Sequence, residues 1–311
     1  MIETIELPMI ALGLRMAALL ADAQRLLQIV GDLQQPVQQR LLALGRLAAE
    51  IDAYWSERAF STQPSAQVEA SAAVVVDHLL QQATQLLHGE LFALLSAQGT
   101  QLMPIVALSE RQQIWLESYF LQYIYPLLTP LAVDSGRPFP YISSGSLNLL
   151  VLLHTELLST QQHAEVAPRK MQQGPLFARV KVPRMIPRFI QVPTFTAPAG
   201  SAKQLLWSED VVRHFARHLF PGMAVSGIYQ FRLLRANEAI RSLNREINED
   251  DALPTRAERD KAQPVVRLEA ERAMPTAVLR WLTEHVQFSL PLVFRCTPPL
   301  RLSCLLELAE L

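Results

Sequence analysis

Apolar residues in the N-terminal third recur at helical spacing. The pattern predicts a helix over residues 9–30 that stops at Gly31, a second that begins after Pro36, and a third over residues 74–98 that stops at Gly99. The second buries one face, because its apolar positions follow the i, i+3, i+4, i+7 rule. These positions are Leu44, Leu47, Ala48, Ile51, Tyr54 and Trp55. The sequence therefore predicts an all-helical domain over residues 1–105.

Beyond residue 105 the periodicity changes from helix to strand. A helix capped by Ser109 runs into a connection in which prolines forbid regular helix. Residues 147–153 are apolar on both faces, which is typical of a central strand. Alternating strands are expected at 176–182, 229–233 and 265–271, and helices at 208–219 and 275–286. This order predicts an α+β domain over residues 106–311 with a mostly antiparallel sheet.

Composition excludes several classes of protein. The chain has 311 residues, 50% of them hydrophobic, and a net charge of −1, so it exerts no long-range attraction on nucleic acid. Its apolar runs fall short of the ~20 residues that cross a bilayer, and no signal peptide pattern opens the chain. Cys296 and Cys304 suggest neither a disulfide scaffold nor a zinc site. We expect a soluble cytoplasmic protein without a membrane span.

The sequence holds one basic cluster and one histidine pair of interest. Arg179, Lys181, Arg184 and Arg188 follow one another closely, and guanidinium groups suit phosphate oxygens, so they are candidates for contact with a polyanion or a partner. The alternative is the solvated face of an edge strand protected by charge. The histidines at 214 and 218 are spaced i, i+4 but lack an H-E-x-x-H pattern, so no metal site is expected.

Three segments resemble bacterial polyphosphate kinase. Pro36–Arg58 lines up without gaps on a helix of that family, with Asp52 among the identities. Pro126–Leu149 follows the family's P-V-L-T-P-L-A-V-D-x-x-x-P-F-P-x-I-S-N-L-S-L-N-L, except that Ser144 replaces asparagine and Gly145 replaces leucine. Leu176–Pro193 is close to F-A-R-V-K-V-P-R-V-L-P-R-F. The resemblance covers the family's N-terminal and middle ("head") domains.

The resemblance implies a link to transfer of the ATP terminal phosphoryl group to polyphosphate, with ATP and Mg as the family's cofactors. The family asparagine that contacts the nucleotide corresponds to Glu50. An ionised carboxylate only accepts hydrogen bonds and would repel ATP. The alternative is that Glu50 is a solvated helix residue with no site beside it. We therefore expect weak or no ATP binding by these residues, and no cofactor for the isolated chain.

The family's catalytic histidines and its phosphate- and metal-binding arginines lie in two further domains that this sequence does not match. No catalytic residue is carried over, and no Walker A or other nucleotide motif occurs. Three hypotheses remain open: a non-catalytic binding, assembly or regulatory module, one half of a split polyphosphate kinase, and an independently active phosphotransferase. The resemblance also implies a homo-oligomer or a catalytic-half polypeptide as partner, and polyphosphate as a candidate ligand.

Overall fold

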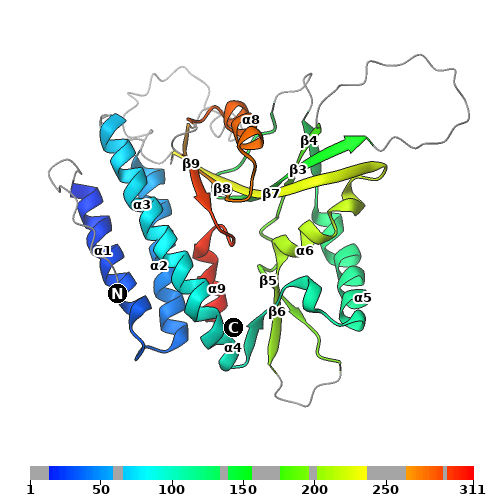
Figure 1. Ribbon diagram of the computed structural model, residues 1–311, viewed down its shortest axis with the longest axis horizontal. Helices are drawn as coiled ribbons and strands as arrows, with labels where there is room; N and C mark the ends of the chain where they lie inside the picture. The colour runs from blue at the N-terminus through cyan, green and yellow to red at the C-terminus, as the bar shows by residue number, and fades with distance from the viewer. Residues whose placement is uncertain are drawn as a thin grey trace, which may run out of the picture.

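The computed structural model describes residues 14–58, 66–133, 139–155, 176–195, 202–236, 264–289 and 293–311. Figure 1 shows a group of helices at one end of the molecule, a twisted sheet beside it, and further helices at the other end. The first group consists of α1 (Leu14–Gly31), α2 (Val37–Arg58), α3 (Ala66–Leu86) and α4 (Phe92–Ala97). None of the described helices is both long and apolar enough to cross a membrane.

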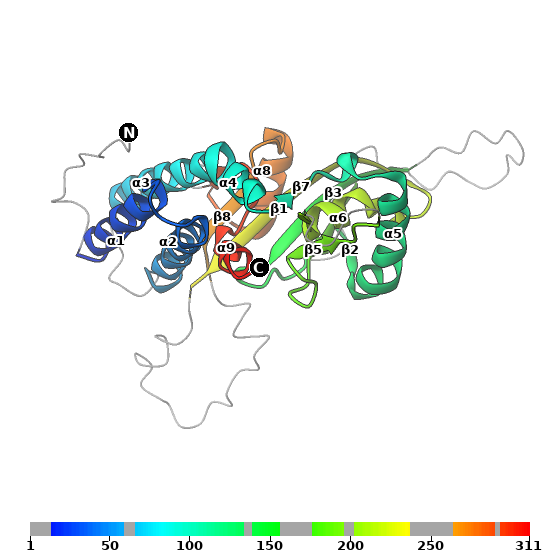
Figure 2. The ribbon, with the colours of Figure 1, turned by 90° about the horizontal axis from the view of Figure 1, so that it is seen from below.

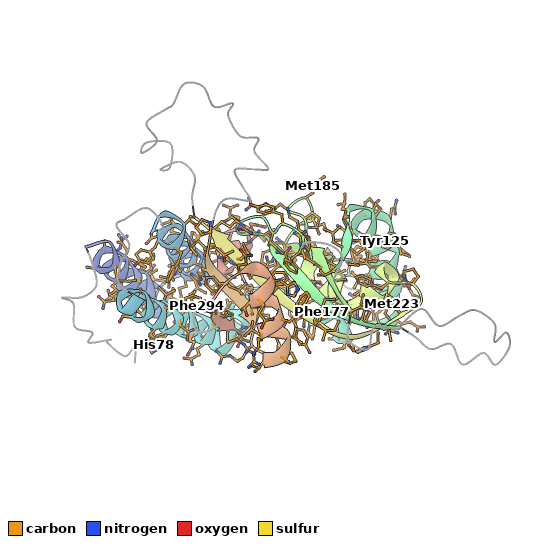
Figure 3. All side chains as sticks on the ribbon, turned by 90° about the horizontal axis from the view of Figure 1, so that it is seen from above. His78, Tyr125, Phe177, Met185, Met223 and Phe294 are labelled. Carbon is orange, nitrogen blue, oxygen red and sulfur yellow. The ribbon has the colours of Figure 1, made fainter. Side chains whose placement is uncertain are left out.

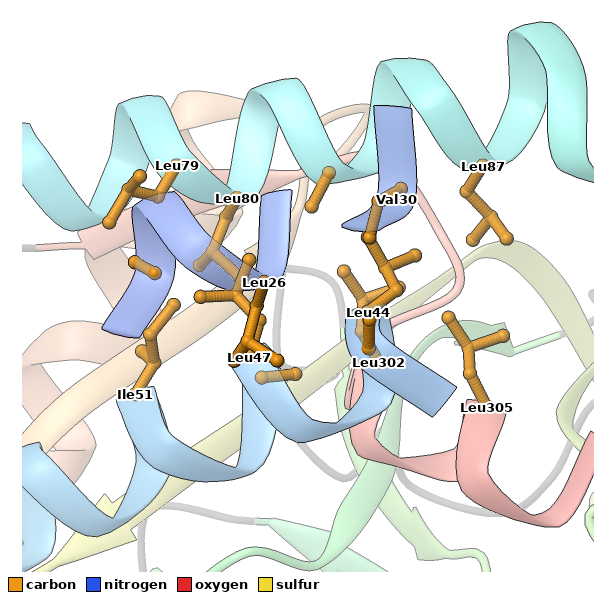
Figure 4. Close-up of a cluster of buried hydrophobic side chains, with 14 of the residues drawn as sticks. Leu26, Val30, Leu44, Leu47, Ile51, Leu79, Leu80, Leu87, Leu302 and Leu305 are labelled. Atoms are coloured by element: carbon orange, nitrogen blue, oxygen red, sulfur yellow. The ribbon is translucent and has the colours of Figure 1, made fainter. Parts of the chain in front are cut away.

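The helical group forms as the periodicity predicts. Figure 4 shows leucines of α1, α2 and α3 meeting in one buried cluster, with Leu44, Leu47 and Ile51 contributed by α2. A π-helical turn (Leu87–Leu91) joins α3 to α4. Two of the side chains in this cluster, Leu302 and Leu305, come from the other end of the sequence.

A six-stranded sheet forms the centre of the second part. Its strands are β2 (Pro130–Val133), β3 (Leu147–Thr155), β4 (Leu176–Lys181), β7 (Met223–Arg235), β8 (Val265–Glu271) and β9 (Val293–Cys296), in the order β2-β4-β3-β7-β8-β9. Neighbours are antiparallel except β8 and β9. The predicted α+β class with a mostly antiparallel sheet is confirmed. β3 is central, because Leu149 and Leu150 are fully buried in cores on opposite faces.

The alternative interpretation of the basic cluster, the solvated face of an edge strand, is wrong for β4. β2 pairs along the outer side of β4, with Pro130 opposite Val180, so β4 lies inside the sheet. β2 is built from the proline-rich connection, where a ladder strand is not expected because proline lacks an N–H donor. Arg179 of β4 is consequently 6% exposed rather than solvated.

Helices cover both faces of this sheet. On one face α8 (Thr276–Val286) places Trp281 in a stack with Phe177 of β4, the ring centroids 3.8 Å apart; Figure 3 labels Phe177 within the sheet. The other face is covered by α5 (Glu110–Tyr119) and α6 (Ser208–His214). Phe120 and Phe215, the residues that directly follow these two helices, stack with their ring centroids 4.8 Å apart. Ser109 caps α5 in a capping box with Gln112, as its sequence position predicts.

Two connections tie the helical group to the rest. β1 (Thr100–Leu102) follows α4 and pairs in parallel with β6 (Lys203–Trp207), which also pairs with β5 (Phe189–Val192). At the other end of the chain, α9 (Leu305–Ala309) lies against α2 (Figure 2). The predicted domain division after residue 105 falls just beyond β1, and it stays a prediction.

Candidate functional site

A cavity of about 620 Å³ opens where the helical group meets the sheet. Its walls come from five places in the sequence: α2, the loop before β3 with the first residue of that strand, the segment from the end of β4 to the first residue of α6, Leu234 of β7, and the C-terminal segment. The polar residues that line it are Asp52, Ser144, Arg184, Arg188, Ser208, Arg301, Ser303, Cys304 and Glu307. Three of these side chains are arginines, which makes the cavity a candidate anion site. We call it the arginine pocket.

Arg188 is the most tightly held of the three arginines. Its side chain is 5% exposed, and one terminal nitrogen donates to Glu209 Oε1 at 2.6 Å and to the Leu300 carbonyl oxygen at 2.9 Å. Glu209 is itself buried on α6 and fixes the guanidinium from behind. The Arg188 Nε has no hydrogen-bond partner among the described residues. A buried donor without a partner costs about 1–3 kcal/mol.

Arg301 brings a second guanidinium to the pocket from the far end of the chain. Its backbone lies in the left-handed region at φ 58°, a conformation that costs a residue with a side chain of order 1–3 kcal/mol. Burial lowers the pKa of Arg301, and the positive charges of Arg188 and Arg184 lower it further. The three cations therefore repel one another, and an anion bound between them would relieve that repulsion.

Arg184 completes the set, and Gly145 gives it room. Gly145 has φ 68° and donates its N–H to the Leu233 carbonyl oxygen at 2.8 Å, a backbone position that favours glycine. A Cβ at this position would lie 3.9 Å from an Arg184 terminal nitrogen. The resemblance places leucine here, so the glycine leaves open a volume that a larger side chain would occupy.

A buried ion-pair network holds the α2 wall of the pocket against the sheet. Asp52 on α2 pairs with Arg232 of β7, whose Nε lies 2.8 Å from Glu269 Oε2 on β8. Arg267 pairs with the same Glu269 and lies 3.9 Å from Asp52. Both arginines are at most 2% exposed, whereas Asp52 retains 24% exposure towards the pocket. The network fixes the spacing between α2 and the sheet.

The structure divides the predicted basic cluster. Arg184 and Arg188 line the pocket, but Arg179 and Lys181 do not. Burial lowers the pKa of Arg179, whose Nε donates to Asn148 Oδ1 at 2.8 Å inside the sheet. The Lys181 Nζ reaches Ser143 Oγ at 3.5 Å. Only the second half of the cluster can contact a ligand in the pocket.

Glu50 faces another part of the molecule. It is half-buried on α2, and burial raises its pKa, with the charge of Asp22 on α1 as the next cause. Arg25 and Arg46 oppose that shift. Glu50 is not among the residues that line the arginine pocket, whereas Asp52, two positions further along, is.

Sequence reasoning missed Arg301 and Glu307 altogether. They lie more than a hundred residues from Arg184, and nothing in the local pattern of residues 290–311 distinguishes them from a terminal helix. Within the described ranges, no group of three or more histidine, cysteine, aspartate or glutamate side chains could hold a metal ion. His214 ends α6 and His218 lies in the 3-10 turn that follows.

Comparisons with known proteins agree with the resemblance. The family model for the polyphosphate kinase middle domain matches residues 111–308. "Polyphosphate kinase 1" of Chlorobaculum tepidum is 32% identical over 257 residues, covering 80% of this chain and 34% of that protein. "Polyphosphate kinase" of Streptomyces coelicolor is 30% identical over 311 residues, covering 93% and 38%.

The fold has a solved counterpart. The crystal structure of polyphosphate kinase from Porphyromonas gingivalis superimposes with a TM-score of 0.74 at 18% identity, covering 94% of this chain and 40% of that one. The chain thus spans little more than a third of the length of these two relatives. With the middle-domain model matching well over half of its residues, the chain belongs to the polyphosphate kinase family.

Proposed function

We propose that this chain is a non-catalytic binding module for ATP-dependent polyphosphate synthesis, and that the arginine pocket holds the phosphate chain. The observation that supports this most directly is the convergence of Arg184, Arg188 and Arg301 on one cavity. Arginine forks match phosphate oxygens in geometry and keep their charge at any physiological pH.

The serine hydroxyls and the location of the pocket support the same ligand class. Ser144 and Ser303 line the cavity, and their hydroxyls can donate to phosphate oxygens that the guanidiniums leave free. The pocket opens between two parts that the Asp52 network holds at a fixed spacing. A pre-formed site binds without the cost of first ordering its walls.

ATP and Mg enter the proposal only as the family's cofactors. The carboxylate of Glu50 stands where the family resemblance expects an amide, and its nearest charged neighbours include Asp22. We expect titration of the chain with Mg-ATP to give no saturable heat at millimolar nucleotide. Tight binding that weakens in Glu50→Asn would contradict this reading of Glu50.

Calorimetric titration with polyphosphate of defined length tests the proposal. Arg184→Gln and Arg301→Gln should each weaken binding about tenfold or more, because a hydrogen bond to a charged group contributes about 1.5–3 kcal/mol. Arg280→Gln on the exposed surface of α8 removes the same charge away from the pocket and should leave the affinity nearly unchanged. Equal weakening in all three variants would indicate non-specific attraction and would refute the pocket.

A second candidate function, the non-catalytic half of a split enzyme, is favoured by an exposed apolar surface. Between α5 and β2 five large apolar side chains are each 36% to 61% exposed: Ile114, Leu121, Tyr125, Leu127 and Leu131; Figure 3 labels Tyr125. Large apolar patches often mark interaction sites. Light scattering of the chain with and without a polypeptide that resembles the family's catalytic domains tests this, and a mass that never changes would argue against it.

A further inference from the structure

The C-terminal segment of the chain forms one wall of the arginine pocket. α9 is seated on α2 by Leu305 and Leu308, which are buried, and by Leu306, which approaches Gly45. This seating leaves Glu307, on the same short helix, lining the pocket. A carboxylate is therefore held beside the cations that a phosphate ligand would need.

Glu307 already contacts one of those cations. Its Oε1 lies 3.7 Å from a terminal nitrogen of Arg301, and the two side chains are 56% and 19% exposed. A charge-assisted hydrogen bond is normally about 2.7–2.9 Å long, so this contact is loose. It neutralises part of the positive charge of the pocket without locking the arginine in place.

The other carboxylate on a pocket arginine behaves differently. Glu209 lies 2.6 Å from Arg188 and is 1% exposed, so moving it away would leave the buried Arg188 charge without a counter-ion. Glu307 is more than half exposed, and water can replace its contact with Arg301 at little cost. One carboxylate is thus part of the framework, while the other can be displaced.

We propose that Glu307 is a built-in competitor for the arginine pocket. Without a ligand the Glu307 carboxylate contacts Arg301, and a phosphate group must displace that carboxylate before Arg301 can bind the phosphate oxygens. The inference rests on the proposed function, because it describes how the same pocket is regulated. It predicts that the resting affinity for polyphosphate is lower than the three arginines alone would give.

The test compares single and double variants by calorimetric titration with polyphosphate of defined length. Glu307→Gln keeps the size of the side chain and removes the charge, and should tighten binding about two- to fivefold, the worth of an exposed ion pair. Glu310→Gln removes a charge from the same segment at a residue that does not line the pocket, so its gain should be clearly smaller. In the Arg301→Gln background, Glu307→Gln should bring no gain, because the pair is already absent.

The possible outcomes separate the competitor proposal from the proposed function of the pocket. If the native chain binds polyphosphate and Glu307→Gln changes nothing, the pocket stands and the competitor is refuted. If Glu307→Gln and Glu310→Gln tighten binding equally, or if the gain persists without Arg301, the effect is general electrostatics and the competitor is again refuted. If neither the native chain nor Glu307→Gln binds polyphosphate, both proposals fail. Binding that appears only in Glu307→Gln would support the competitor most strongly.

Discussion

Gly45 lies where α9 comes closest to α2, and replacing it with alanine tests how firmly the C-terminal segment is seated. A Cβ built on Gly45 would lie 2.9 Å from both Cγ and Cδ2 of Leu306 and 3.0 Å from the Leu306 backbone nitrogen. The Leu306 side chain can rotate away, but its backbone nitrogen cannot move unless the whole of α9 shifts. A shift of α9 would also disturb the packing of Leu305 and Leu308 on α2.

Two opposing effects set the magnitude. Alanine is favoured over glycine inside a helix by about 0.8–1.0 kcal/mol. Forcing an extra methyl group into a packed contact costs about 1–3 kcal/mol. Because the contact here includes backbone, we expect the packing cost to exceed the helical gain and Gly45→Ala to lower the free energy of unfolding by roughly 1 kcal/mol.

Gly89 provides the matched control. It occupies an exposed position in the π-helical turn after α3, and a Cβ there would meet nothing within 4 Å. Gly89→Ala should therefore raise the free energy of unfolding by up to about 1 kcal/mol. Urea denaturation followed by circular dichroism measures both variants, and unchanged m-values would show that the comparison concerns stability alone. If Gly45→Ala stabilises the protein as much as Gly89→Ala does, the close seating of α9 on α2 is refuted.

Two further predictions concern buried charge. Asp52→Asn should lower the free energy of unfolding by about 1–3 kcal/mol, because Arg232 and Arg267 would then have only the Glu269 carboxylate between them. The control is Asp22→Asn, which removes a carboxylate from an exposed ion pair and should change the free energy of unfolding by less than about 0.5 kcal/mol. Equal effects in urea denaturation would contradict the network. Burial raises the pKa of Asp210 above its ordinary 3.8, so the stability that it contributes is present below pH 3.8 and is lost as the pH rises through the raised pKa. Asp210→Asn should remove the part of the stability loss at rising pH that comes from Asp210. If the pH profiles of thermal unfolding were identical for the native chain and Asp210→Asn, the assignment of this loss to Asp210 would be contradicted.

The sequence predicted elements well because each has a local cause. Helical periodicity marked α2, continuous apolar character marked β3 as central, and Ser109 marked the start of α5. Ala178 and Val180 do face one core while Phe177 faces another, as strict alternation predicts. These features depend on neighbours in sequence, and a pattern of a few residues encodes them.

The prediction of the site was partial because the arginine pocket depends on pairing between distant segments. Arg179 lies inside the sheet because β2 pairs with the outer edge of β4, and nothing in the sequence of β4 reveals that neighbour. Arg184 and Arg188 were marked by their clustering, but their separation from Arg179 follows from where β4 ends. Arg301 lies just before α9, which is seated on α2 by a contact between residues roughly 260 positions apart.

The seating of α9 on α2 also has a consequence for synthesis on the ribosome. Leu302, Leu305 and Leu308 belong to the same core as Leu44 and Leu47 of α2, yet roughly 260 residues must be translated between the two sets. At about 5–20 residues per second, that interval is on the order of 13–50 s. Throughout it, the nascent helices expose the apolar face that α9 later covers. The packing of α2 is thus complete only after α9 has been translated, long after the synthesis of α2 itself.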